Sequence, residues 1–156
     1  MTSHPRDRYW LEQALLLSGR CTVPRIYCVG CVIVDQEGAQ IAQGYTGELA
    51  YPDGSSGSSP HAEEIALSRM PATTEGATLY STLEPCSERL SGLECCSSRI
   101  ISHGIARVVF GVREPFDSRL QIHCRGEDQL REAGIAVVQL FELEERCLAA
   151  IKRGDT

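Results

Sequence analysis

The sequence lacks long apolar runs, an excess of basic charge and any internal repeat. No stretch of its 156 residues approaches the roughly 18 consecutive apolar residues of a membrane-spanning helix. The net charge is −6, and no basic stretch is interleaved with aromatic residues. Proteins that bind nucleic acids are usually basic, because phosphate contacts dominate their affinity. We therefore expect no membrane and no nucleic-acid partner, and a small-molecule substrate.

The start of the chain also lacks a secretory core. Charges at Arg6, Asp7 and Arg8 lie beside the short apolar stretch 11–17, so we expect a cytoplasmic protein. Eight cysteines in such a chain do not indicate a disulfide framework. Six of them are expected to be reduced and packed as small apolar side chains. These are Cys21, Cys28, Cys31, Cys96, Cys124 and Cys147.

The sequence does contain a set of residues that can bind a metal ion, and their order indicates the kind of site. His61-Ala62-Glu63 is followed by Pro85-Cys86 and then by the pair Cys95-Cys96. One His and two Cys bind zinc and leave its fourth position open to water. Each motif alone is weak evidence for a metal site. A His beside a Glu at a helix start usually lies on the protein surface, and a Pro-Cys usually marks a turn with a buried thiol. Together they form the H-x-E…P-C signature of zinc-dependent nucleobase deaminases.

Glu63 is expected to carry protons rather than to bind the metal. Residues two apart on a helix point about 200° away from each other, so Glu63 does not readily join His61 as a ligand. A carboxylate beside a zinc site is suited to moving protons between water and a substrate. We therefore predict Glu63 as the catalytic residue.

Hydrophobic periodicity predicts alternating helices and strands. The expected helices cover 9–19, 61–70, 95–103, 126–133 and 142–152, and the expected strands cover 28–34, 39–45, 77–83, 106–112 and 135–140. This order predicts a single domain over 1–156 with a three-layer α/β/α fold around a five-stranded mixed sheet. The fourth and fifth strands have a helix between them and should therefore be parallel.

Two segments leave alternatives open. The Gly/Ser/Pro-rich loop 47–60 immediately precedes His61 and is either a lid over the site or an ordinary connection. Cys28-Val29-Gly30-Cys31 could suggest a second metal or a redox pair. Because residues three apart on a strand face opposite sides, two separate buried thiols are the favoured interpretation.

The chain resembles the cytidine deaminase-like superfamily, and within it the deaminase domain of the bifunctional riboflavin biosynthesis protein. The resemblance runs through nearly the whole chain. The matching segments are 29–34, His61-Ala62-Glu63, 76–80, Thr82-Leu83-Glu84-Pro85-Cys86-Ser87, Cys95-Cys96, 104–109 and 133–135. Eight residues separate Cys86 from Cys95, as in the riboflavin-type deaminases.

The resemblance implies a three-layer fold, one zinc ion per subunit and a homodimer or higher homo-oligomer. It implies His61, Cys86 and Cys95, rather than Cys96, as the zinc ligands. The substrate that it implies is a diaminopyrimidinone with a ribosylamino phosphate. We expect only the deaminase half of the bifunctional protein here.

Departures from the family concern the substrate pocket. The family has Asn-Pro where this chain has Ile26-Tyr27. A segment resembling His-x-Gly-Arg/Lys-Thr-Pro-Pro, part of which holds the phosphate, is replaced by 88–94, which begins Glu88-Arg89. We expect these four residues to contact the substrate. Acidic replacements disfavour a dianionic ligand, which suggests an unphosphorylated aminated heterocycle or nucleoside. Alternatively, Arg89, Arg119 or Arg125 supplies the phosphate contact.

Three further hypotheses remain beside this altered pocket. The chain could be a stand-alone riboflavin-pathway diaminopyrimidine phosphate deaminase. It could deaminate bases in tRNA or single-stranded DNA, which the negative charge disfavours. It could also be a non-enzymatic zinc scaffold, although such a site has no use for Glu63 and usually fills all four metal positions with protein ligands.

Overall fold

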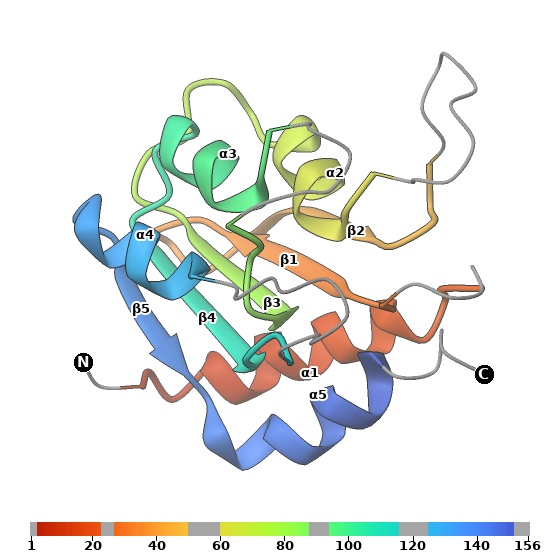
Figure 1. Ribbon diagram of the computed structural model, residues 1–156. Helices are drawn as coiled ribbons and strands as arrows, with labels where there is room; N and C mark the ends of the chain where they lie inside the picture. Colours follow the sequence, from red (N-terminus) through yellow and green to blue (C-terminus); the bar gives the residue numbers. More distant parts are fainter. Residues whose placement is uncertain (1–2, 23–26, 50–59, 88–93, 116–124, 152–156) are drawn as a thin grey trace.

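The computed structural model of the chain describes residues 3–22, 27–49, 60–87, 94–115 and 125–151. Helices cover both faces of one sheet (Figure 1). In chain order the elements are α1 (Asp7–Ser18), β1 (Gly30–Val34), β2 (Gln40–Tyr45), α2 (Ala62–Arg69), β3 (Thr78–Leu83), α3 (Cys96–Ser102), β4 (Arg107–Val112), α4 (Gly126–Glu132), β5 (Ala136–Gln139), a 3-10 turn (Phe141–Leu143) and α5 (Glu144–Ile151).

The sheet has five strands in the order β2-β1-β3-β4-β5. β1 pairs antiparallel with β2 and with β3, whereas β3, β4 and β5 run parallel. This confirms the predicted mixed sheet and its parallel fourth and fifth strands. The carboxyl ends of β3 and β4 consequently lie at the same edge, where ligands usually bind in sheets of this type.

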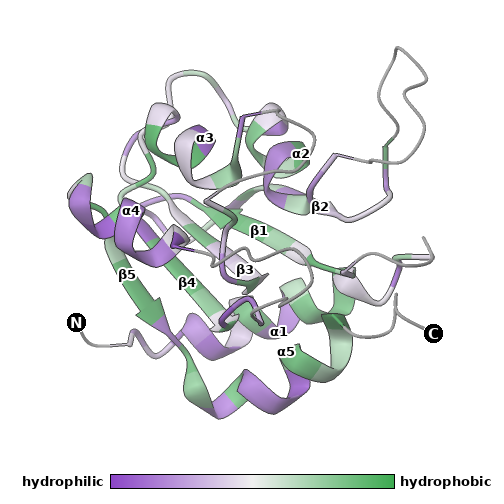
Figure 2. Cartoon of the chain, in the orientation of Figure 1, coloured by the Kyte–Doolittle hydropathy of each residue, from purple (hydrophilic) through white to green (hydrophobic). Residues whose placement is uncertain are grey.

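The two helical layers bury different parts of the sheet. α1 and α5 lie on one face, and α2, α3 and α4 lie on the other (Figure 1). Hydrophobic residues predominate in β1, β4 and β5, and hydrophilic residues are frequent in the helices (Figure 2). All five residues of β1 are buried, as expected for a strand covered on both faces. Gly30 allows close packing there, because a Cβ at this position would lie 1.8 Å from the Ala14 carbonyl oxygen of α1.

Glycines end the two short helices of the second layer. Gly104 follows α3 with φ of 71°, and Gly134 follows α4 with φ of 85°. Only glycine adopts this left-handed conformation at little cost, so both residues end their helices and direct the chain into the next strand. The predicted glycine stops after 95–103 and 126–133 are confirmed.

A buried ion cluster fixes α1 to the sheet. The Asp7 carboxylate is fully buried and accepts hydrogen bonds from Arg107 at 2.7 and 2.6 Å. It also accepts from the Tyr80 hydroxyl at 2.8 Å and from the His4 amide at 2.6 Å. Burial by itself raises the pKa of Asp7, but these donors, with Arg107 first, bring the pKa below its ordinary value. Asp7 is therefore held in its ionised form.

The structure corrects the expectation for two cysteines. Cys21 and Cys28, predicted to be reduced, form a disulfide between the end of α1 and the residues before β1. Cys31 and Cys147 are free and buried, as expected. No local pattern indicated the bond, because the two Cys are brought together only when α1 packs on the sheet. No helix in the described ranges has the length and apolar character needed to span a bilayer.

Candidate metal centre

His61 lies immediately before α2, in an extended conformation with φ of −70° and ψ of 156°. We predicted a helix from 61 to 70, but the helix begins one residue later, at Ala62. The angular argument for residues two apart on a helix therefore does not apply to His61 and Glu63. The extended backbone instead leaves the imidazole free to point toward α3, while Glu63 lies in the first turn of α2.

Three candidate ligand atoms come together between α2, α3 and the end of β3. His61 Nδ1 lies 3.3 Å from Cys96 Sγ and 3.8 Å from Cys86 Sγ. The ligand atoms of these three residues all lie within 4.8 Å of one another. One imidazole and two thiols at such distances match the donor set of a zinc site with an open fourth position. The residues therefore fit a zinc ion.

The Cys86 thiol is surrounded by groups that favour its ionised form. The backbone N–H of Cys96 donates to Cys86 Sγ at 3.1 Å. The hydrogen bond from the Cys96 side chain, followed by those from His61 and the Cys96 amide, lowers the pKa of Cys86 to about 4 despite its burial. A thiolate is the form of cysteine that binds metals.

Cys95, which the resemblance implied as a ligand, lies outside this group of three residues. α3 begins at Cys96, and Cys95 precedes it in an extended conformation. Cys95 Sγ consequently points away, toward Ser98 Oγ at 3.2 Å and Gln129 Oε1 at 4.0 Å. The spacing from Cys86 could not distinguish two adjacent cysteines, because neighbouring residues at a helix start point in different directions. The group that the structure brings together thus contains Cys96, whereas the resemblance implied Cys95.

Glu63 lies beside the thiols and is almost fully buried, with 4% of its surface exposed. Its Oε2 is 3.6 Å from Cys96 Sγ, and its Oε1 is 2.8 Å from Ser81 Oγ on β3. Burial raises the pKa of Glu63 and the Cys86 thiolate adds to this effect, while His61 acts in the opposite direction. The carboxyl group is thus close to the candidate ligands without being one of them.

Sequence reasoning missed Ser81 and Glu84. Ser81 is a polar residue in a buried strand, and that unusual placement was the available signal. Glu84 lies in the Leu83-Glu84-Pro85-Cys86 motif and is 5% exposed. Its place two residues before Cys86 was the available signal, but the partners of its carboxylate are 30 and 43 residues away in the sequence.

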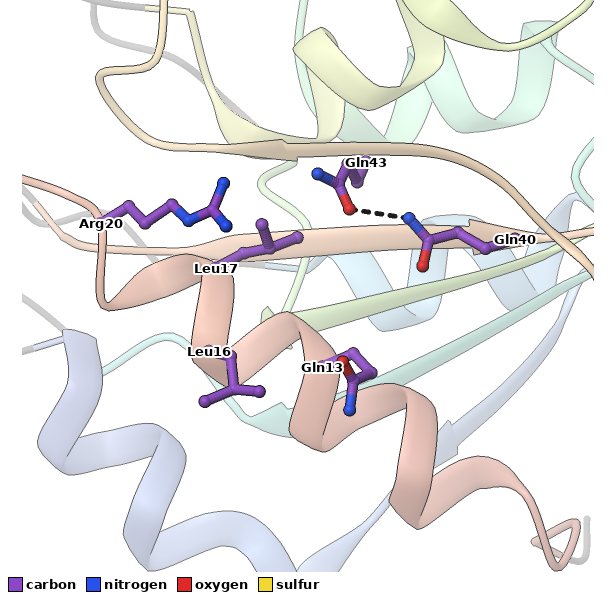
Figure 3. A pocket seen from close by; sticks show the side chains of 6 residues that line it. All are labelled: Gln13, Leu16, Leu17, Arg20, Gln40 and Gln43. Carbon is purple, nitrogen blue, oxygen red and sulfur yellow. Dashed lines mark hydrogen bonds between the residues drawn. The ribbon is translucent and has the colours of Figure 1, made fainter.

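The predicted substrate contacts are only partly described. Tyr27 is partly buried and packs against the hydrophobic core. Ile26, Glu88 and Arg89 lie outside the described residues, as do 50–59 of the loop considered as a lid. A hollow of about 160 Å³ lies elsewhere, between α1 and the edge strand β2 (Figure 3). Its lining residues are Gln13, Leu16, Leu17, Arg20, Gln40 and Gln43, which do not include any candidate ligand.

Comparison with known proteins accounts for this arrangement. Residues 4–112 match the family described as the cytidine and deoxycytidylate deaminase zinc-binding region. The chain belongs to this family. The match includes His61, Glu63, Cys86 and Cys96, so the residues that the structure gathers lie within the family's zinc-binding region.

Relatives of this deaminase domain include riboflavin-pathway proteins, as the motifs predicted. The Schizosaccharomyces pombe diaminohydroxyphosphoribosylamino-pyrimidine deaminase is 36% identical over 160 residues, covering 99% of this chain and 36% of the relative. The Escherichia coli riboflavin biosynthesis protein RibD is 35% identical over 153 residues, covering 95% of this chain and 38% of the relative. The chain thus spans little more than a third of these relatives.

Solved structures agree with the fold. The Aspergillus oryzae Rib2 deaminase in complex with DARIPP matches with a TM-score of 0.76 and 27% identity, over 96% of this chain and 91% of the other. A Thermotoga maritima diaminohydroxyphosphoribosylaminopyrimidine deaminase/reductase also matches with a TM-score of 0.76, at 28% identity, over 95% of this chain and 40% of the other. The predicted deaminase fold is confirmed.

Proposed function

We propose that this chain catalyses the zinc-dependent hydrolytic deamination of a small pyrimidine-like heterocycle. The observation that carries the proposal is the position of the buried Glu63 carboxyl, 3.6 Å from a thiol of the His61, Cys86 and Cys96 group. A structural zinc site usually has four protein ligands and needs no buried acid beside it. Three ligands and an adjacent acid are what a hydrolytic site requires.

We propose His61 Nδ1, Cys86 Sγ and Cys96 Sγ as the zinc ligands. When bound there, zinc acts as a Lewis acid and makes water a stronger nucleophile at neutral pH. The amide of Cys96 stabilises the Cys86 thiolate. The surrounding helices α2 and α3 limit the access of bulk solvent to the group, which strengthens the electrostatic interactions inside it.

Glu63 is the proposed proton carrier. In the reaction an aminated ring carbon forms a bond to the oxygen of water, its bond to nitrogen breaks, and ammonia leaves. Glu63 transfers the two protons of the water in turn: it accepts the first and delivers it to the ring nitrogen, then accepts the second and delivers it to the departing amine, which leaves a carbonyl on the ring. The hydrogen bond to Ser81 keeps the carboxyl group in one orientation, so that Oε2 faces the site while Oε1 is held by the strand.

The leading substrate class is the aminated pyrimidine on which the named relatives act. The Schizosaccharomyces pombe relative is named a diaminohydroxyphosphoribosylamino-pyrimidine deaminase, and the match covers 99% of this chain. A second candidate is an unphosphorylated heterocycle or nucleoside. The presence of Ile26-Tyr27 and of Glu88 at the positions discussed above favours it, because an acid near a phosphate group weakens binding.

Ammonia release by the zinc-loaded protein tests both candidates. The panel contains the phosphorylated diaminopyrimidine, its dephosphorylated form, and cytosine and guanine bases with their nucleosides. Turnover of the phosphorylated compound identifies a riboflavin-type deaminase, and turnover of unphosphorylated compounds alone identifies an altered pocket. If no compound releases ammonia, the proposed reaction is wrong.

Glu63→Gln is the matched catalytic variant. It keeps the size of the side chain but cannot carry a proton, so we expect turnover to fall by about 10²–10⁴-fold while zinc content stays unchanged. Activity equal to that of the wild type would refute the proposed role of Glu63. A protein that binds zinc yet is inactive in both forms would instead support a scaffold.

A further inference from the structure

Glu84 joins three elements next to the candidate metal centre. It follows β3 directly, and its backbone N–H donates to the Val112 carbonyl at 2.9 Å. Its carboxylate, nearly buried, accepts from the amide of Glu114 at 3.3 Å and from the amide of Glu127 at 3.0 Å. One side chain therefore connects the end of β3 to the residues after β4 and to the first turn of α4.

The start of α4 is packed directly against the residues around Cys86. A Cβ on Gly126 would lie 1.8 Å from the Pro85 carbonyl oxygen, so only glycine allows this approach. The amide of Arg125 donates to Ser87 Oγ at 2.8 Å. The beginning of α4 thus packs against one side of the segment 85–87.

The start of α3 packs against the opposite side of this segment. The amide of Ser97 donates to the Cys86 carbonyl at 3.1 Å, and the amide of Cys96 donates to Cys86 Sγ at 3.1 Å. Cys86 therefore lies between two helix starts. The start of α3 is hydrogen-bonded to Cys86 itself. The start of α4 is instead hydrogen-bonded to the Glu84 carboxylate.

We propose that Glu84 is a positioning residue for the Cys86 thiolate. Glu84 acts through the backbone of α4, whose start packs against the segment 85–87 on the side opposite α3. A carboxylate is required because two N–H donors each need an acceptor oxygen, and an ionised carboxylate supplies two. This role rests on the zinc site proposed above, since it concerns the placement of one of its ligands.

Glu84→Gln tests the role with little change in volume. Glutamine has only one acceptor oxygen, and its NH₂ group would face the second backbone N–H, so one of the two segments must move. Replacing a residue that supports a metal ligand typically costs 10–100-fold in metal affinity. We expect zinc affinity, measured by chelator competition, to fall by about 10–100-fold, and the thiolate-to-metal absorption of the Co²⁺-loaded protein to change.

Asp7→Asn is the matched control. Asp7 is also a buried carboxylate that accepts from several donors, but it lies on the opposite face of the sheet. We expect this variant to lose stability while keeping the wild-type Co²⁺ spectrum and zinc affinity. The comparison separates a general loss of stability from a displaced ligand.

The outcomes distinguish the role of Glu84 from the zinc site itself. A Glu84→Gln protein that is less stable but has the wild-type spectrum and zinc affinity refutes the positioning role alone. A wild-type protein that binds no Co²⁺ refutes the zinc site and the positioning role with it. If Glu84→Gln does not fold, Ser87→Ala removes the acceptor of the Arg125 amide from the same contact. An unchanged spectrum and affinity in that variant would also overturn the proposal.

Discussion

The two faces of the sheet each bury a carboxyl group, and they surround it differently. Asp7, on the α1 face, is held by the Arg107 guanidinium, which keeps its pKa low. Glu63, on the α2 face, has two thiols and a serine hydroxyl nearby, and burial raises its pKa. The same chemical group is a fixed charge in one place and the proposed proton carrier in the other, because its neighbours differ.

Consecutive residues of β3 serve the two carboxyl groups. The Tyr80 hydroxyl donates to Asp7 on one face, and Ser81 Oγ hydrogen-bonds Glu63 on the other. Successive side chains of a strand point to opposite faces, so one short segment supports both sites. A single-residue shift of β3 would exchange the two partners and disrupt both arrangements.

The largest effect is expected on the α2 face, from Cys96→Ala. Loss of one of three ligands should reduce zinc from about one ion per chain to nearly none and abolish turnover. Cys95→Ala is the matched variant and should retain zinc, because Cys95 Sγ points toward Ser98. Metal analysis of the two purified proteins decides between them. Zinc lost from Cys95→Ala but kept by Cys96→Ala would restore the original ligand choice.

On the α1 face, Asp7→Asn should reduce stability without affecting the site. Removing one partner of a buried ion pair typically costs about 3–5 kcal/mol, because the other charge stays buried. Here Arg107, whose side chain is 20% exposed, would lose its carboxylate partner, so the loss should lie at or below the lower end of this range. Chemical denaturation would measure the free energy of unfolding. A loss of zinc at unchanged stability would show that the two faces are not independent.

The contribution of Asp7 should depend on pH in a defined direction. Its pKa in the folded protein lies below its ordinary value of 3.8, so the folded state binds fewer protons there than the unfolded state. The stabilisation is therefore complete above this ordinary value and is lost as the pH falls through the folded pKa. The difference in unfolding free energy between wild type and Asp7→Asn should shrink over that range. A constant difference down to the lowest pH at which the protein folds would contradict the ion pair.

The smallest effect is expected at the hollow beside β2. Leu16 lines this hollow and is 69% exposed, so Leu16→Gln removes little buried surface (Figure 3). Surface substitutions of this kind usually change stability by less than about 0.5 kcal/mol. Thermal denaturation and zinc content should match those of the wild type. A substantial loss of stability would show that Leu16 is covered by something in solution.

The order of elements was predictable because it depends on local periodicity. The continuous apolar run before Asp35 predicted a strand covered on both faces, and β1 is fully buried. Gly104 and Gly134 predicted the ends of α3 and α4, and both adopt positive φ. The residue types of the candidate metal centre followed from His61-Ala62-Glu63 and Pro85-Cys86, since a zinc site of this kind requires those side chains.

What the sequence alone determined was the set of elements, the deaminase-like motifs and the identity of the acid beside the candidate metal centre. Tertiary structure decided which of two adjacent cysteines faces His61, because that depends on where α3 begins relative to Cys86. It also decided the disulfide between Cys21 and Cys28, and the partners of Asp7 and Glu84. The contacts of His61, Asp7 and Glu84 join residues that are 35, 100 and 43 positions apart, whereas Cys21 and Cys28 are seven positions apart and meet where the chain leaves α1 for β1. Their distances are set by packing of helices on the sheet, which no local pattern encodes.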